Sequence, residues 1–146
     1  MRQLTLDISP RGEPTLDSFV PGANREALEQ VVALARGALR EAILYLWGEQ
    51  GSGRTHLLRA AGRANPSLVI ADDVDLMSEA GLQELFLAIN AAREGGAPVL
   101  AAGHHPPAQL RLREDLRTRL GWGLVYQLRP LTDAHKAIHL RGVRPR

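Results

Sequence analysis

The chain has 146 residues, of which 45% are hydrophobic, and a formal net charge of +2, so it suits one globular domain with a substantial core. The absence of cysteine excludes disulfides and thiolate metal sites. No apolar run approaches the length of a membrane span, and residues 1–7 lack the apolar core of a secretory signal. We therefore expect a cytoplasmic protein with no membrane partner.

The charge is distributed unevenly along the chain. Residues 1–104 carry nine basic and thirteen acidic side chains, a balance of −4, whereas residues 105–146 carry nine basic and three acidic ones, a balance of +6. The basic end suits an acidic partner.

The first stretch, residues 3–8, alternates polar and apolar side chains and is followed by Pro10, Gly12 and Pro14. Two interpretations fit this pattern about equally well, a tethered binding peptide and an edge strand packed on the domain. We divide the chain into a peptide with its tether, residues 1–14, and a main domain, residues 15–146.

The main domain begins with a predicted helix over residues 25–36, for which Asn24 is the expected N-cap and Gly37 the end. Residues 43–47 form an apolar run of strand length. A glycine-rich loop follows this run, and residues 55–63 are predicted to be helical, which gives a strand, a loop and a helix in succession.

The loop, residues 48–55, fits G-x-x-x-x-G-[KR]-[ST], the phosphate-loop motif with arginine in place of lysine. Its backbone N–H groups and the start of the next helix are suited to an anion. Thr55 is expected to hold magnesium, and Arg54 to neutralise a terminal phosphate. Arginine does not replace lysine freely in phosphoryl transfer, so the motif favours binding over fast turnover. The alternative is a plain glycine-rich turn. The expected phosphate-binding residues are Gly48, Gly51, Ser52, Gly53, Arg54 and Thr55.

Residues 68–71 are predicted to form a buried strand that ends in Asp72 and Asp73. Ligands of open parallel sheets bind at the carboxyl ends of the strands, so both aspartates are expected at the nucleotide, with Asp72 as a magnesium ligand beside Thr55. The alternative is that Asp72, Asp73 or Asp75 caps the helix that begins near Ser78.

The remaining elements alternate in the same way. A helix through Asn90 precedes a strand over residues 98–102, and a basic helix and turn over residues 108–119 precede a strand over residues 124–128. His104 follows the third strand at its carboxyl end and is placed to reach a nucleotide. Thr132 is the expected cap of a last helix, and His135 and His139 are expected to be surface groups because no glutamate accompanies them.

Six segments together carry a resemblance to a known family. They are Gln3-Leu4-Thr5-Leu6, Phe19-Val20-Pro21-Gly22, Leu44-Tyr45-Leu46-Trp47 before the loop, Asp72-Asp73, Pro106-Pro107-Ala108-Gln109-Leu110, and Leu116-Arg117-Thr118-Arg119-Leu120-Gly121-Trp122-Gly123. With them, nearly the whole chain resembles the AAA+ proteins of the bacterial initiator group, and most closely the Hda family of DnaA-related regulatory inactivators.

The resemblance implies a three-layer α/β P-loop NTPase domain of the AAA+ type. It implies a mostly parallel sheet in which the fourth, first, third and second strands lie side by side, with one edge strand fewer than the family has. No part of the sequence corresponds to the family's helical lid, so the lid domain is expected to be absent.

The resemblance also implies a function. Gln3, Leu4 and Leu6 would bind the sliding clamp, the beta subunit of DNA polymerase III, and so contact DNA only indirectly. The nucleotide would be ADP or ATP with magnesium. By motif position Arg119 would be an arginine finger that acts in trans on DnaA-bound ATP, making the chain a regulator of replication initiation without its own turnover.

Two other functions remain open on the sequence, an autonomous P-loop ATPase and a degenerate interaction module that binds no nucleotide. Without the resemblance, Arg119 is one member of a solvated basic face that includes Arg111, Arg113 and Arg117.

Overall fold

The structure is a computed structural model that describes residues 24–49 and 52–130. Three groups of residues with predicted roles lie outside this part of the chain: Gln3, Leu4 and Leu6, which were predicted to bind the clamp; Gly51 of the loop; and the C-terminal residues Thr132, His135 and His139. Within the described part, no helix is both long enough and apolar enough to cross a membrane.

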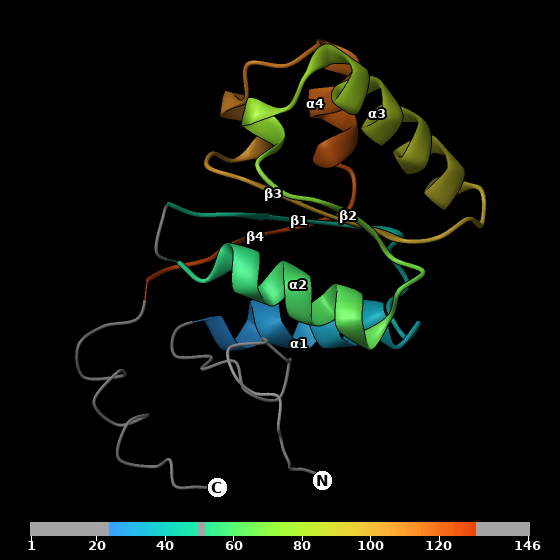
Figure 1. Ribbon diagram of the computed structural model, residues 1–146, viewed down its shortest axis with the longest axis vertical. Coiled ribbons are helices and arrows are strands. Elements are labelled where there is room, and N and C mark those ends of the chain that lie inside the picture. The colour runs from blue at the N-terminus through green and yellow to red at the C-terminus, as the bar shows by residue number, and fades with distance from the viewer. Residues whose placement is uncertain (1–23, 50–51, 131–146) are drawn as a thin grey trace, which may run out of the picture.

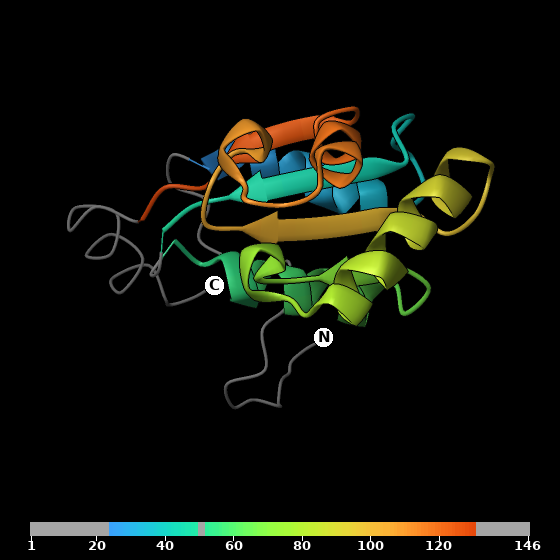
Figure 2. The same cartoon turned by 90° about the horizontal axis from the view of Figure 1, so that it is seen from above.

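The described strands form one parallel sheet. They are β1 (Ile43–Trp47), β2 (Val69–Ala71), β3 (Val99–Gly103) and β4 (Leu124–Gln127). Their spatial order is β2-β3-β1-β4, and every neighbouring pair is parallel. The predicted strand order is therefore confirmed, and the carboxyl ends of all these strands share one edge of the sheet (Figure 2).

Helices cover both faces of the sheet (Figure 1). The first face carries α1 (Arg25–Ala35) and α2 (Arg54–Ala64), and the second carries α3 (Glu79–Arg93) and α4 (Glu114–Leu120). Short 3₁₀ turns, η2 (Val74–Leu76) and η3 (Pro107–Gln109), follow β2 and β3. These elements confirm the predicted three-layer α/β architecture.

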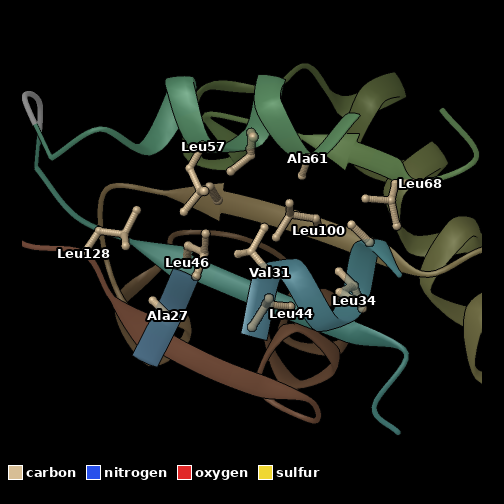
Figure 3. Packing of buried hydrophobic residues seen from close by; sticks show 13 residues of the cluster. Ala27, Val31, Leu34, Leu44, Leu46, Leu57, Ala61, Leu68, Leu100 and Leu128 are labelled. Carbon is tan, nitrogen blue, oxygen red and sulfur yellow. The ribbon is translucent and has the colours of Figure 1, made fainter. Parts of the chain in front are cut away.

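The two cores meet at β1, whose side chains alternate between the faces. Leu44 and Leu46 pack with α1 and α2 in one core, and Ile43 and Tyr45 pack with α3 and α4 in the other. Figure 3 shows the first core, with Leu44 and Leu46 among side chains from both helices. These four of the five β1 side chains are buried, as expected for a strand covered on both faces.

Two local predictions were wrong, and a third, the N-cap at Asn24, is confirmed in position but not in its hydrogen bond. The second strand was expected to be buried, but β2 lies at an edge of the described sheet and Ile70 is 37% exposed. A basic helix and turn were expected over residues 108–119, but this segment begins with the end of η3 and α4 begins only at Glu114. Asn24 occupies the N-cap position of α1 but makes no side-chain cap bond. Its amide instead donates to the carbonyl oxygen of Arg129, and its Oδ1 accepts from the Arg129 N–H, both at 2.8 Å.

Tyr45 fixes the carboxyl edge from inside the sheet. Its hydroxyl donates to the carbonyl oxygen of His105 at 2.7 Å. A Cβ added at Gly103 would lie 2.5 Å from the Tyr45 hydroxyl, so glycine is required for this approach. Burial, assisted by the negative charge of Asp75 and opposed by Arg54, raises the pKa of Tyr45 well above its ordinary value.

The Tyr45→Phe variant is expected to lose about 1 kcal/mol of unfolding free energy at neutral pH, because the buried bond to His105 is removed. Above about pH 10 the unfolded chain ionises at Tyr45 while the folded chain does not, so wild-type stability falls as the pH rises. The unfolding free energy of the Tyr45→Phe variant should therefore fall less steeply at alkaline pH than that of the wild type. Urea denaturation at neutral and alkaline pH checks both effects, and parallel curves for the two proteins would contradict the role of Tyr45.

Candidate functional site

The described residues of the loop between β1 and α2 are closely packed. Gly53 has φ of +88°, a conformation that favours glycine. A Cβ added at Gly48 would lie 2.5 Å from the carbonyl oxygen of Leu128 and 3.0 Å from Ser52 Oγ. The glycines of the predicted motif are therefore needed for the turn at Gly53 and for the close approach at Gly48.

Arg54, the first residue of α2, points into the protein and is 7% exposed. Its Nε donates to Asp72 Oδ1 at 2.9 Å, and its Nη2 forms an ion pair with Asp73. Its Nη1 donates to the carbonyl oxygens of Gly48 at 2.9 Å and Gly103 at 3.1 Å. The guanidinium thus joins the loop to the carboxyl edges of β2 and β3.

The two predicted magnesium ligands are neighbours. Thr55 Oγ1 donates to Asp72 Oδ2 at 2.7 Å, and the N–H of Asp73 donates to Asp72 Oδ1 at 2.8 Å. Neither aspartate caps α3, because Ser78 is its N-cap and accepts from the Gly81 N–H at 3.1 Å. The alternative interpretation of these carboxylates as helix caps is therefore wrong.

The donor groups at this edge fit a nucleotide phosphate with magnesium. Ser52 Oγ is buried, and within the described residues it has no hydrogen-bond partner. It lies just before the N-terminus of α2, where unpaired backbone N–H groups favour an anion. Thr55 and Asp72 supply the oxygen ligands that Mg²⁺ prefers, and Mg²⁺ commonly completes its coordination with phosphate oxygens and water.

One pair at the edge was not predicted. His104 Nδ1 lies 2.8 Å from Asp75 Oδ2, and the His104 N–H approaches Asp75 Oδ1 at 3.4 Å. Burial raises the pKa of Asp75, but hydrogen bonds and the charge of His104 outweigh it and leave that pKa below its ordinary value. The sequence contained one indication of this pair, because both residues follow the ends of adjacent parallel strands.

No group of three or more His, Cys, Asp or Glu side chains that could hold a metal ion occurs in the described ranges.

Arg119 lies at the opposite edge of the sheet from Arg54. It is near the end of α4, directly before β4. Its Nε donates to Asn90 Oδ1 at 2.8 Å, and its guanidinium lies 4.5 Å from the ring centre of Phe86 and 4.8 Å from that of Trp122. The structure therefore does not bring Arg119 to the loop of its own chain.

The other arginines of this basic segment have different surroundings. Arg117 donates to the carbonyl oxygens of Leu110 and Leu112 at 3.4 and 3.5 Å, and Arg113 donates to Gln83 at 3.0 Å. Arg113 also lies over the Phe86 ring, at 5.1 Å, but Arg119 contacts two rings, Phe86 and Trp122, which distinguishes it from the solvated basic face considered above.

No protein-family model matches the sequence. Among solved structures, the chain is similar to domain III of the replication initiation protein DnaA from Thermotoga maritima, with a TM-score of 0.78 and 22% identity over 90% of this chain and 73% of that one. It is also similar to a DNA replication initiation factor, with a TM-score of 0.78 and 22% identity over 92% of this chain and 55% of the other.

A third similar structure is DnaA bound to AMPPCP and single-stranded DNA, with a TM-score of 0.71 and 23% identity over 81% of this chain and 50% of that one. The chain thus spans only about half the length of the second and third of these proteins. At these identities the likeness concerns the fold. The chain has the parallel-sheet α/β fold of domain III of DnaA.

Proposed function

We propose that the chain is a nucleotide-binding regulator of replication initiation of the Hda type. Tethered to the sliding clamp through Gln3, Leu4 and Leu6, it stimulates hydrolysis of DnaA-bound ATP and so inactivates DnaA. The fold of DnaA domain III supports a role in replication initiation.

The observation that carries the nucleotide part is the meeting of Ser52, Thr55 and Asp72 at one sheet edge. Two DnaA structures of the same fold are bound to AMPPCP, which supports an adenine nucleotide, ADP or ATP, at this place. The proposed site residues, which either bind the nucleotide or hold the residues that bind it, are Gly48, Gly51, Ser52, Gly53, Arg54, Thr55, Asp72 and Asp73.

The residues that contact the nucleotide or its metal have different parts in this binding. The loop N–H groups and the Ser52 hydroxyl donate to phosphate oxygens, and Thr55 and Asp72 hold magnesium. When bound, magnesium neutralises phosphate charge. We expect no turnover of nucleotide by the chain itself, because Arg54 lacks the compact ammonium of the usual lysine and is engaged by two carboxylates.

The trans role of Arg119 is supported by its position. The nucleotide edge and Arg119 lie at opposite ends of the strands, so a phosphate that reaches Arg119 must belong to another molecule. Phe86, Trp122 and Asn90 hold the guanidinium in one place before any partner arrives, which lowers the cost of orienting it.

A second candidate function is an interaction module without nucleotide. It is favoured by one observation, the occupation of the Arg54 guanidinium by Asp72, Asp73 and two carbonyl oxygens of the chain itself. A nucleotide titration separates the two, and turnover by the isolated chain would instead indicate an autonomous ATPase.

In calorimetry with ADP or ATP and magnesium, the wild type is expected to bind. Ser52→Ala and Thr55→Ala should each weaken binding by about tenfold or more, because each removes a hydrogen bond or ligand to a charged group. Ser78→Ala is the matched control, since it removes the α3 cap and should lower stability by about 1 kcal/mol without changing affinity. No detectable binding by the wild type up to millimolar nucleotide would favour the interaction module.

Arg119→Ala is expected to abolish stimulation of DnaA ATP hydrolysis by the clamp-bound protein, because an arginine finger contributes about 10³ to 10⁵ in rate. Arg119→Lys should not restore it, since a point charge lacks the planar fork. The assay compares both variants with Arg117→Ala at equal occupancy of clamp loaded on DNA. Full stimulation by Arg119→Ala would exclude the finger, and equal partial losses in Arg119→Ala and Arg117→Ala would indicate a diffuse contact.

Replacing Gln3 and Leu4 together by alanine is expected to abolish capture by purified sliding clamp, because these side chains are the proposed anchors of an extended peptide. Thr5→Ala is the control within the same segment and should retain capture. If the double variant binds the clamp as well as the wild type does, the segment has another role, such as an edge strand.

A further inference from the structure

Four of the five N–H donors of the Arg54 guanidinium are directed at oxygens of its own chain. Its three nitrogens contact two carboxylates and two backbone carbonyls, from Asp72, Asp73, Gly48 and Gly103. The side chain is 8% exposed, so these contacts are largely shielded from water. In a phosphate loop the corresponding basic side chain is expected to face the phosphate, and here it faces the sheet.

These contacts join segments that are distant in sequence. Gly48 directly follows β1, Gly103 is the last residue of β3, and the two aspartates directly follow β2. Only a side chain with several donors in a fixed fork can hold such a set at once. A lysine ammonium has one nitrogen and therefore cannot reach all of these oxygens in the same arrangement.

The aspartates need this guanidinium for electrostatic reasons. Asp72 and Asp73 are consecutive carboxylates with side chains 22% and 44% exposed, and both pair with Arg54. Asp73 also adopts a left-handed backbone conformation, φ of +52°, which non-glycine residues rarely occupy. Without Arg54 the two charges would repel, and Asp72 Oδ1 would lose its side-chain donor.

We propose that Arg54 is a positioning residue: it holds Asp72 and Asp73 and the loop in place through its own contacts, and it does not bind the nucleotide phosphate directly. Asp72 in turn accepts from Thr55, so Arg54 orients the proposed magnesium ligands. This assignment differs from the phosphate contact that the motif predicts. Its nucleotide part rests on the proposed function, whereas the stability part does not.

The first test separates an indirect effect from a direct phosphate contact by measuring ADP affinity with magnesium and with EDTA. Arg54→Met should weaken binding by about tenfold or more in magnesium, because the metal ligand Asp72 is no longer held, but by no more than about twofold in EDTA. Arg54→Lys should not restore the magnesium-dependent affinity. An equal loss with and without magnesium, or rescue by lysine, would overturn the proposal.

Arg59→Met is the matched control for this substitution. Arg59 lies on the same helix, on its exposed side, and the change removes the same charge and length of side chain. It should leave ADP affinity unchanged in both conditions. An Arg59→Met variant with the same magnesium-dependent loss would show that net charge near the loop is responsible, and would overturn the assignment to Arg54.

The second test needs no nucleotide. Arg54→Met should lower the Tm of the free protein by several degrees, because the buried Gly48 carbonyl loses its side-chain donor and two carboxylates lose their cation. Asp73→Asn in the same chain should recover part of that loss, so the double variant is more stable than the sum of the single changes predicts. Additive losses would overturn the pairing.

The affinity test and the stability test can be contradicted independently of each other. If the wild type binds no ADP, the proposed function fails, and the non-additivity of Arg54→Met and Asp73→Asn still decides whether Arg54 holds the acidic pair. If Arg54→Met does not fold, the Arg54→Lys variant carries both measurements, because lysine keeps the charge but not the fork.

Discussion

The burial of β1 is the constraint on which the rest of the structure depends. The strand is paired with β3 and β4 on its two sides and is covered by helices on both faces. Its side chains must therefore be apolar or satisfied internally, as Tyr45 is, and reactive groups are confined to the two ends. At the amino end a Cβ on Gly123 would collide with the Ile43 carbonyl, so this end is closely packed as well.

Local pattern was sufficient to predict the strands and the meeting of Thr55 with Asp72, whereas the order of the strands came from the family resemblance. Apolar runs followed by glycine or acidic residues mark the carboxyl ends of parallel strands, and such ends meet at one edge. The pattern could not predict where Arg54 points, because a motif specifies a residue type and not its rotamer. It also missed Ile70 and the Asp75–His104 pair, since edge position and contacts between strand ends depend on the assembled sheet.

The arginines at the two edges of the sheet have different partners, carboxylates at the carboxyl edge and an aromatic ring at the amino edge. At the carboxyl edge a cation is neutralised by carboxylates of the same chain, so little positive charge from Arg54 is available to solvent. At the amino edge Arg93 and Arg119 lie against Trp122, at 3.9 and 4.8 Å from its ring centre, and the ring holds them without cancelling their charge. The excess of basic residues after position 104 therefore includes a cation, Arg119, that is held in place and keeps its charge.

The hydrogen bonds between the Asn24 amide and the Arg129 backbone join residues that are 105 positions apart in sequence, the largest separation among the hydrogen bonds described here. Such a closure is expected to form late in folding, because the sheet must assemble before the two segments meet. Once formed, it prevents the start of α1 and the exit from β4 from fraying independently, since opening either one breaks both amide bonds. The two ends of the described domain, at Asn24 and Arg129, consequently lie at the same corner of it.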